Sequence, residues 1–294
     1  MANEQSGAVH MQSTPRRPAL RWYGGKWMLA PWIIAHFPKH QVYVEPFCGA
    51  ASVLLRKPPC YAEVINDLDQ SVVNLFRVLR SDRADELITA LNLTPFARDE
   101  FVSAYDDTDC PVERARRLII RSFMGFGSNA HHRATGFRAN SNRSGTTPAH
   151  DWSNYPDALR AIVERIKPLD GSSDGVTVEN RDAKACMAQH DAPTTLHYVD
   201  PPYVLDTRSD TRTDYDHELS DDDHAELLTF LRGLRGMVVL SGYPSDQYDA
   251  ALADWRRVER VAFADGARKR TEVLWINPAA SAAGRSSPTL FEVA

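Results

Sequence analysis

The sequence predicts an α/β sheet domain that is interrupted by a helical and loop insertion. Short β-branched and aromatic runs alternate with amphipathic segments near the start of the chain and again after residue 157. Between them, residues 84–124 show only helical patterning, and residues 125–156 form a long Gly, Ser, Asn, Thr and Arg stretch. We expect a polar tail over 1–18, the sheet domain over 19–81 and 152–294, and the insertion over 82–151.

The first part of the chain contains two strand and helix units. Residues 41–45 (QVYVE) are typical of a strand, and the following PFCGAASVLLR contains a turn and then a helical segment. Residues 62–66 predict a second strand, and residues 71–80 a helix with apolar residues on one face.

The same alternation returns in the second part. Helices are expected at 157–166, 183–188, 221–234 and 245–253, and strands at 176–179, 237–241, 257–263, 272–277 and in the run LHYV that ends at Asp200. The helix at 221 is preceded by Ser220 and begins with acidic residues, which cap a helix N-terminus well.

Composition indicates a globular protein of a reducing compartment. The chain has 294 residues, of which 43% are hydrophobic, and its cysteines contain no C-x-x-C pair. No signal peptide and no run of about 20 apolar residues is present, so we expect a cytoplasmic protein without a membrane partner.

Acidic residues stand at or just beyond four predicted strand ends: Glu45, Asp67, Asp182 and Asp200. Each alone could be a turn former or a helix cap. Ligands of open α/β sheets bind at the carboxyl ends of the strands, so the set predicts a negatively charged rim around a ligand with hydroxyls, an amino group and a positive charge. S-adenosylmethionine has these groups, whereas the glycine patterns of dinucleotide and triphosphate sites are absent.

Five motifs occur in order along nearly the whole chain: LRWYGGK, YVEPFCGAASVLL, EVINDLD, ENRDA and YVDPPY. In this set the sequence resembles the Dam-like class of S-adenosylmethionine-dependent DNA adenine-N6 methyltransferases. The resemblance implies a Rossmann-like methyltransferase sheet with an inserted helical target-recognition domain. DPPY alone is shared with enzymes that methylate other amines, whereas W-x-G-G-K with E-P-F-x-G is more specific.

The resemblance also assigns roles at the cofactor site. It implies that Asp67 binds the ribose hydroxyls and Asp182 the adenine amine of S-adenosylmethionine. The remaining cofactor-binding residues it implies are Trp22, Tyr23, Lys26, Glu45, Phe47 and Gly49. The class usually has glycine where this chain has Ala51, so we expect a turn that wraps the cofactor less tightly.

The segment Asp200, Pro201, Pro202, Tyr203 suits methyl transfer to an amine. The Asp200 carboxylate and the Pro201 carbonyl could each accept one N–H of the target amine, and the prolines stiffen the turn that holds them. A base in a duplex must be rotated out to be reached, and Tyr203 offers an aromatic face to stack on it. We expect this face to matter more than the hydroxyl. The alternative for an isolated Asp-Pro-Pro is a strand terminator.

Residues 114–150 contain seven arginines and no acid, although the chain has a net charge of −5. This local positive field favours phosphate, and the alternative is a solvated helix followed by a loop. The expected nucleic-acid-binding residues are Arg121, Asn129, Arg133, Arg138, Asn140 and Arg143. His131 and His132 lack a third ligand, so no metal is expected. Arg268, Lys269 and Arg270, before a final strand, could contact the DNA backbone, and the alternative is a basic hairpin turn.

The sequence therefore predicts an enzyme that transfers a methyl group from S-adenosylmethionine to adenine N6 in double-stranded DNA. One alternative is an N-methyltransferase of the same fold that acts on cytosine N4, RNA or a protein amide. Another is an inactive DNA-binding relative that has kept the fold.

Overall fold

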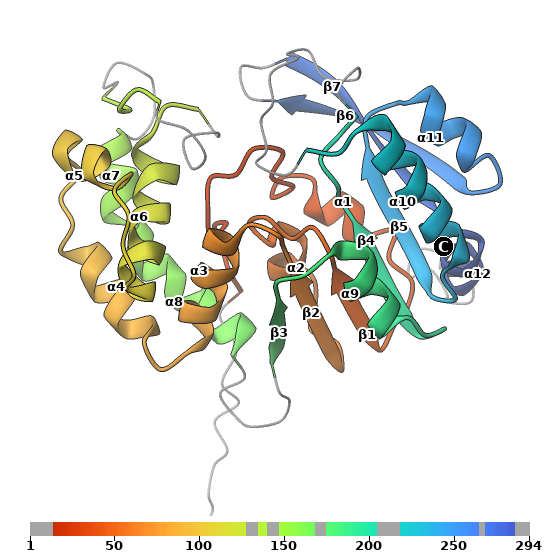
Figure 1. The fold of residues 1–294 in the computed structure, drawn as a ribbon, viewed down its shortest axis with the longest axis horizontal. Coiled ribbons are helices and arrows are strands. Elements are labelled where there is room, and N and C mark those ends of the chain that lie inside the picture. The colour runs from red at the N-terminus through yellow and green to blue at the C-terminus, as the bar shows by residue number, and fades with distance from the viewer. Residues whose placement is uncertain are drawn as a thin grey trace, which may run out of the picture.

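The computed structural model describes residues 14–127, 135–139, 147–167, 175–204, 218–264 and 268–285. Its centre is a seven-stranded sheet with the strand order β3-β2-β1-β4-β5-β7-β6 (Figure 1). The first five strands are parallel, and β7 and β6 continue the sheet in antiparallel pairing. The strands are β1 (Val42–Glu45), β2 (Ala62–Asn66), β3 (Val176–Glu179), β4 (Thr195–Val199), β5 (Met237–Gly242), β6 (Arg256–Ala264) and β7 (Arg268–Ile276).

Helices cover both faces of the sheet because its central strands are buried on both sides. In β4, Tyr198 belongs to the core on one face and Val199 to the core on the other. The first face is covered by α1 (Ala30–Ile34), α2 (Ser52–Arg56), α3 (Gln70–Arg80) and α12 (Pro278–Arg285). The second is covered by α9 (Ala183–His190), α10 (Asp221–Gly233) and α11 (Asp246–Ala251).

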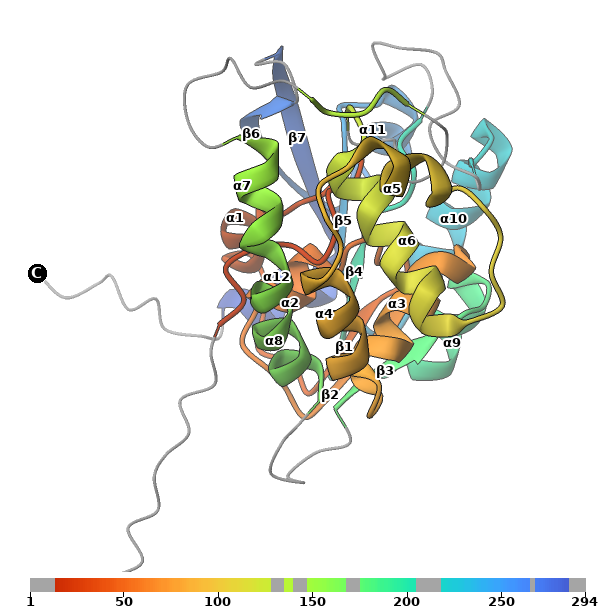
Figure 2. The same ribbon diagram turned by 90° about the vertical axis from the view of Figure 1, so that its left-hand side faces the viewer.

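The remaining helices form what we call the helical group. It consists of α4 (Ala84–Asn92), α5 (Arg98–Ser103), α6 (Pro111–Met124), α7 (Pro148–Ser153) and α8 (Tyr155–Ile166). The group lies beside the β3 end of the sheet, and α6 joins it to the sheet layer by packing against α3 (Figure 1). Helix α4 lies between α6 and α8 (Figure 2). Because α8 packs against α4 and α7, the packed helices continue beyond residue 151.

Most expected strands and helices appear within a few residues of their predicted bounds. Helices α1 and α12 were not predicted, and two further elements differ from the expectation. Helix α7 lies inside the stretch expected to be a loop, where Pro148 occupies its first turn and Thr147 caps it. Strand β7 begins at Arg268, four positions before the predicted start at 272, so the expected basic turn is partly strand. Pairing with β6 along its whole length overrides the low strand propensity of these basic residues.

Among the parts of the chain that the structure describes, no helix combines the length and the apolar character that crossing a membrane requires.

Candidate active site

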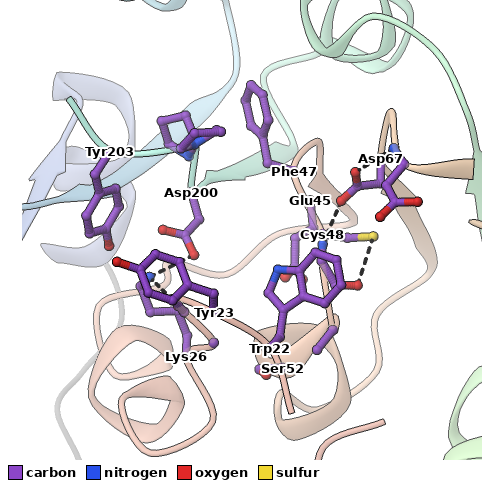
Figure 3. A pocket seen from close by; sticks show the side chains of 17 residues that line it. Trp22, Tyr23, Lys26, Glu45, Phe47, Cys48, Ser52, Asp67, Asp200 and Tyr203 are labelled. Carbon is purple, nitrogen blue, oxygen red and sulfur yellow. Dashed lines mark hydrogen bonds and ion pairs between the residues drawn. The ribbon is translucent and has the colours of Figure 1, made fainter. Parts of the chain in front are cut away.

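A cavity opens at the carboxyl ends of β1, β2 and β4, where α/β sheets bind their ligands. Its empty space, including the part open to solvent, is about 790 Å³. Eleven of the twelve residues expected to bind the cofactor or to catalyse line it (Figure 3). They are Trp22, Tyr23, Lys26, Glu45, Phe47, Gly49, Asp67, Asp200, Pro201, Pro202 and Tyr203.

The turn after β1 requires a glycine at position 49. The backbone of Gly49 has φ +45°, and a Cβ there would lie 2.5 Å from Nε1 of Trp22. The Trp22 indole therefore lies directly on this turn. Ala51 also has a left-handed backbone, with φ 49° and ψ 37°, which explains a preference for glycine at its position. The chain accepts the strain of a non-glycine residue here, of order 1–2 kcal/mol.

Glu45 ends β1 as a buried carboxyl with 3% exposure. Its Oε2 accepts hydrogen bonds from the Tyr43 hydroxyl at 2.9 Å and from the Leu54 backbone N–H at 3.1 Å. Burial, with a smaller contribution from Asp200, raises the pKa of Glu45 to about 8 despite these hydrogen bonds. A buried acid with remaining acceptor capacity favours a cationic ligand group.

Asp67 and Asn66 join the loops after three strands. Asp67 Oδ2 accepts the backbone N–H of Gly49 at 2.8 Å. The Asn66 side chain donates to the carbonyls of Pro46 and Arg181 and accepts the N–H of Arg181. Asn66 is 1% exposed and had no assigned role, although EVINDLD contains it. It holds the loops after β1 and β3 at the end of β2.

Asp200, Lys26 and Tyr203 form one end of the cavity, called here the Asp200 end (Figure 3). Lys26 Nζ lies 3.0 Å from Asp200 Oδ2 and donates to the Gly24 carbonyl at 2.8 Å. Asp200 Oδ1 accepts the hydroxyl of Ser241, at the end of β5, at 2.8 Å. Both oxygens of the carboxylate are thus oriented, and each retains a lone pair for a substrate. Lys26, which the resemblance placed at the cofactor, contacts the DPPY segment.

Lys26 carries its charge in a buried position. Burial alone would lower its pKa, but the carboxylates of Asp200 and Glu272 outweigh burial and raise it. The ammonium therefore stays charged at 5% exposure. Its Nζ lies 4.7 Å from the centroid of the Tyr203 ring, within cation–π range.

Tyr203 has further partners that the sequence did not indicate. Its hydroxyl donates to Glu272 Oε2, on β7, at 2.8 Å. Its ring meets that of Tyr243, just after β5, edge to face at 4.5 Å. Ser241, Tyr243 and Glu272 were missed because β5 and β7 bear none of the motifs, and only the sheet order brings them beside β4.

Asp182 occupies a different position from the other acids of the rim. It is exposed and caps α9, where its carboxylate accepts the N–H of Ala185 at 2.9 Å. It does not belong to the lining of the cavity. Asp182 is therefore a helix cap in this structure. Its binding to the adenine amine of S-adenosylmethionine stays a prediction.

The arginines of residues 114–150 are less free than the sequence suggested. Arg116 bridges Glu100 and Glu113, and Arg117 also pairs with Glu113. These acids precede the acid-free stretch but lie beside it in the helical group, so the expected positive field is partly neutralised.

The predicted nucleic-acid-binding residues divide into two sets. Arg121 donates to the Ala104 carbonyl at 3.1 Å, and Arg138 pairs with Asp151 at 3.4 Å. The other residues, Asn129, Arg133, Asn140 and Arg143, lie outside the described residues.

The segment that precedes the cavity is tied to the helical group. The Ser122 hydroxyl, on α6, accepts the N–H of Arg21 at 2.7 Å and donates to the Arg21 carbonyl at 2.9 Å. The Tyr155 hydroxyl, on α8, donates to the Ala19 carbonyl. The position of Trp22 is therefore coupled to two helices of the group.

Within the described ranges, no group of three or more histidine, cysteine, aspartate or glutamate side chains is arranged to hold a metal ion. His131 and His132 lie outside those ranges.

Several known proteins are similar to this chain in sequence. The Type II methyltransferase M1.LlaDCHI of Lactococcus lactis subsp. cremoris is 27% identical over 212 residues, which cover 69% of this chain and 71% of that protein. The Type II methyltransferase M.MjaIII of Methanocaldococcus jannaschii is 25% identical over 247 residues, which cover 74% of this chain and 80% of that protein. A DNA adenine methylase of Escherichia coli K12 is 34% identical over 94 residues, which cover 32% of this chain and 30% of that protein. Residues 22–259 match the family described as D12 class N6 adenine-specific DNA methyltransferase. With the motifs assembled around one cavity, the match over most of the chain shows that this protein belongs to the D12 class of N6 adenine-specific DNA methyltransferases.

Proposed function

We propose that this DNA adenine methyltransferase uses S-adenosylmethionine as its methyl donor and acts on an adenine rotated out of duplex DNA. The observation that carries the proposal is the Asp200 end, where a carboxylate oriented by Ser241 and Lys26 opens on the same cavity as Glu45 and Asp67. An amine acceptor and the acids suited to the cofactor thus line one continuous space.

The cavity fits the proposed cofactor. The Glu45 carboxyl suits a cationic group such as the α-ammonium, and Asp67 the ribose hydroxyls. Trp22, whose indole packs on Gly49, and Phe47 add aromatic side chains to the lining of the cavity. When bound, S-adenosylmethionine supplies a methyl group activated by a sulfonium.

Two acceptors of the DPPY segment would orient the target amine. The Asp200 carboxylate accepts one N–H and the Pro201 carbonyl the other, so that the nitrogen lone pair turns toward the methyl donor. The bonds from Ser241 and Lys26 preorganise Asp200 before the substrate arrives. The amine must lose one proton as it gains the methyl group, and Asp200 is the nearest base in this arrangement.

Tyr203 would hold the flipped base. Its ring lies at the Asp200 end, and stacking of a base on an aromatic side chain stabilises by about 1–3 kcal/mol. Extrusion of a paired base costs a few kcal/mol. Stacking on Tyr203 therefore offsets a substantial part of that cost.

The helical group, with the residues between α6 and α7, is the proposed DNA-recognition region. It follows α3 in the chain and contacts the segment before Trp22, so it adjoins the cavity. Proposed DNA contacts are Arg121, Asn129, Arg133, Arg138, Asn140 and Arg143. Arg121 and Arg138 would have to exchange their present partners for phosphate or base.

The product of the reaction tests this proposal. The enzyme is incubated with S-adenosylmethionine carrying an isotopically labelled methyl group and with unmethylated genomic DNA, and the nucleosides are analysed by mass spectrometry. Labelled N6-methyladenine in duplex DNA is the expected product. N4-methylcytosine alone, or label in RNA or protein alone, would instead support the alternative substrates.

A further inference from the structure

Glu272 is a buried carboxylate that the proposed chemistry does not use. It is 7% exposed and lies on β7, an antiparallel strand outside the parallel part of the sheet. In the register, its neighbour Val273 pairs with Gly242, the last residue of β5. Because β5 pairs with β4, Glu272 lies near the end of β4, where the DPPY segment begins.

Three side-chain contacts hold Tyr203. It stands four residues beyond Val199, the end of β4, in irregular backbone. Its hydroxyl donates to Glu272 Oε2 at 2.8 Å, and its ring contacts Tyr243 and the Lys26 ammonium. Among these contacts, the bond to Glu272 is the one that fixes the far end of the side chain, because the other two act on the ring.

Burying a carboxylate at this position is unfavourable, and the Lys26 ammonium and the Tyr203 hydroxyl compensate part of the cost. Burial raises the pKa of Glu272, and the nearby Asp200 raises it further, against the effects of Lys26 and the Tyr203 hydrogen bond. An uncharged acceptor would satisfy the hydroxyl of Tyr203 with less desolvation. A charged acceptor forms a stronger hydrogen bond, which holds the ring more firmly.

We propose that Glu272 is a positioning residue for methyl transfer, which fixes the Tyr203 ring through the tyrosine hydroxyl so that the ring can stack on the target base. The inference rests on the proposed function, because it requires the flipped base to lie against Tyr203. It adds a role for the Tyr203 hydroxyl to the expectation from sequence that the face of the ring matters more. Removal of the hydroxyl or of its acceptor should loosen the same ring.

A double-mutant cycle tests the inference. Single-turnover methylation is measured for Glu272→Ala, Tyr203→Phe and the double variant, on a duplex that the parent enzyme methylates. Both single variants are expected to lose about tenfold to a hundredfold in rate, the range for a hydrogen bond to a charged group. The double variant should be no slower than Glu272→Ala, because the hydrogen bond that Tyr203→Phe removes is already absent in that variant. Glu272→Gln, which keeps an acceptor but loses the charge, should recover part of the rate.

A second readout follows the base itself. With 2-aminopurine in place of the target adenine, stacking on Tyr203 quenches its fluorescence after extrusion. Glu272→Ala and Tyr203→Phe should raise the fluorescence of the bound complex to the same level. Glu259→Gln is the matched control, since Glu259 is exposed on the neighbouring β6 and pairs with Arg257. It should leave both signals unchanged.

Several outcomes would overturn the inference. Parent-like turnover by Tyr203→Phe, which needs no change at Glu272, would exclude a role for the hydroxyl. Losses that multiply in the double variant would show that Glu272 acts independently of Tyr203. Melting temperature and affinity for S-adenosylhomocysteine identify a variant that has lost its fold. If the parent enzyme forms no N6-methyladenine, the proposed function fails instead, so the two failures are distinguishable.

Discussion

Single residues set the shape of the cofactor end, and Gly49 is the most constrained of them. Replacement by alanine places a Cβ 2.5 Å from Trp22 Nε1 on a backbone with φ +45°. We expect Gly49→Ala to displace the indole and to weaken S-adenosylhomocysteine binding at least about tenfold, the effect of losing roughly 1.4 kcal/mol. Isothermal calorimetry measures the affinity.

Ala51→Gly is the control for that substitution, since it relaxes a neighbouring left-handed residue and introduces no new atom. Its affinity should match the parent. Equal binding by Gly49→Ala and the parent would contradict the packing of Trp22 on the turn.

Glu45 predicts a pH dependence of cofactor binding. With its pKa raised to about 8, the free enzyme holds this carboxyl mainly protonated at neutral pH. A bound α-ammonium would favour the carboxylate and lower that pKa, so binding releases a proton and tightens as the pH rises from 6 to 7.5. The affinity for the cofactor increases by up to about tenfold per pH unit in the range where Glu45 is protonated in the free enzyme and ionised in the complex.

Calorimetry in buffers of different ionisation enthalpy counts the released proton. Glu45→Gln should abolish both the release and the slope. A parent enzyme whose affinity does not change over this pH interval would place the ammonium elsewhere.

Most single residues of the candidate site could be predicted from the sequence, because the acidic and aromatic residues of the motifs stand at or near strand ends. The parallel order then brings Glu45, Asp67 and Asp200 together. Glu272 and Ser241 could not be found in this way. Their approach to DPPY depends on the order β4-β5-β7 and on the register of an antiparallel pair, which periodicity does not specify.

At the scale of elements, the link between α6 and the cavity predicts that the helical group influences cofactor binding. Ser122 exchanges two hydrogen bonds with the Arg21 backbone, next to Trp22. Each neutral hydrogen bond contributes roughly 0.5–1.5 kcal/mol to the stability of the arrangement it holds. Because part of this free energy stabilises the cofactor-bound enzyme, Ser122→Ala should weaken S-adenosylhomocysteine binding by about threefold to tenfold.

Ser122→Thr keeps the hydroxyl and should restore affinity. Ser103→Ala, on the surface of α5, is the control and should change nothing. Parent-like affinity of Ser122→Ala would show that the segment before Trp22 is held without α6.

Element boundaries differed from prediction where tertiary contacts decide them. The start of β7 is basic, and only its pairing with β6 makes it a strand. Helix α7 is short and lies in a polar stretch, but it buries Trp152, whose indole N–H donates to the Thr94 carbonyl at 2.8 Å. Neither contact leaves a periodic signal in the sequence.

At the scale of the molecule, a buried ion cluster joins the sheet to the helical group. Glu63, on β2, lies 2.5 Å from Lys57 Nζ and 2.6 Å from a guanidinium nitrogen of Arg165 on α8. Burial alone would raise the pKa of Glu63, but Arg165 and Lys57 outweigh it and hold the pKa below its usual range. This contribution to stability is complete above the unfolded pKa of about 4.3 and is lost as the pH falls through the folded pKa.

Glu63→Gln should therefore lower the free energy of unfolding by about 3–5 kcal/mol at pH 7, the cost of breaking a buried ion pair. Urea unfolding at pH 7 and below pH 4 should show that the difference from the parent shrinks in acid. Glu86→Gln, which breaks the exposed pair with Arg83, is the control. A difference from the parent that is independent of pH would contradict the assigned charge state.

The central claim is that Asp200 orients the target amine, and single-turnover methylation by Asp200 variants tests it most directly. Asp200→Ala and the isosteric Asp200→Asn are compared with the parent for melting temperature, S-adenosylhomocysteine affinity and rate on paired and mispaired target bases. Both variants should fold and bind S-adenosylhomocysteine. Asp200→Ala should lose at least the ~100-fold to 1,000-fold in rate typical of removing one preorganised electrostatic group, on both duplexes. Near-parent turnover by a folded Asp200→Ala, or loss of activity only in proportion to loss of stability, would contradict the claim and leave Asp200 as a strand terminator.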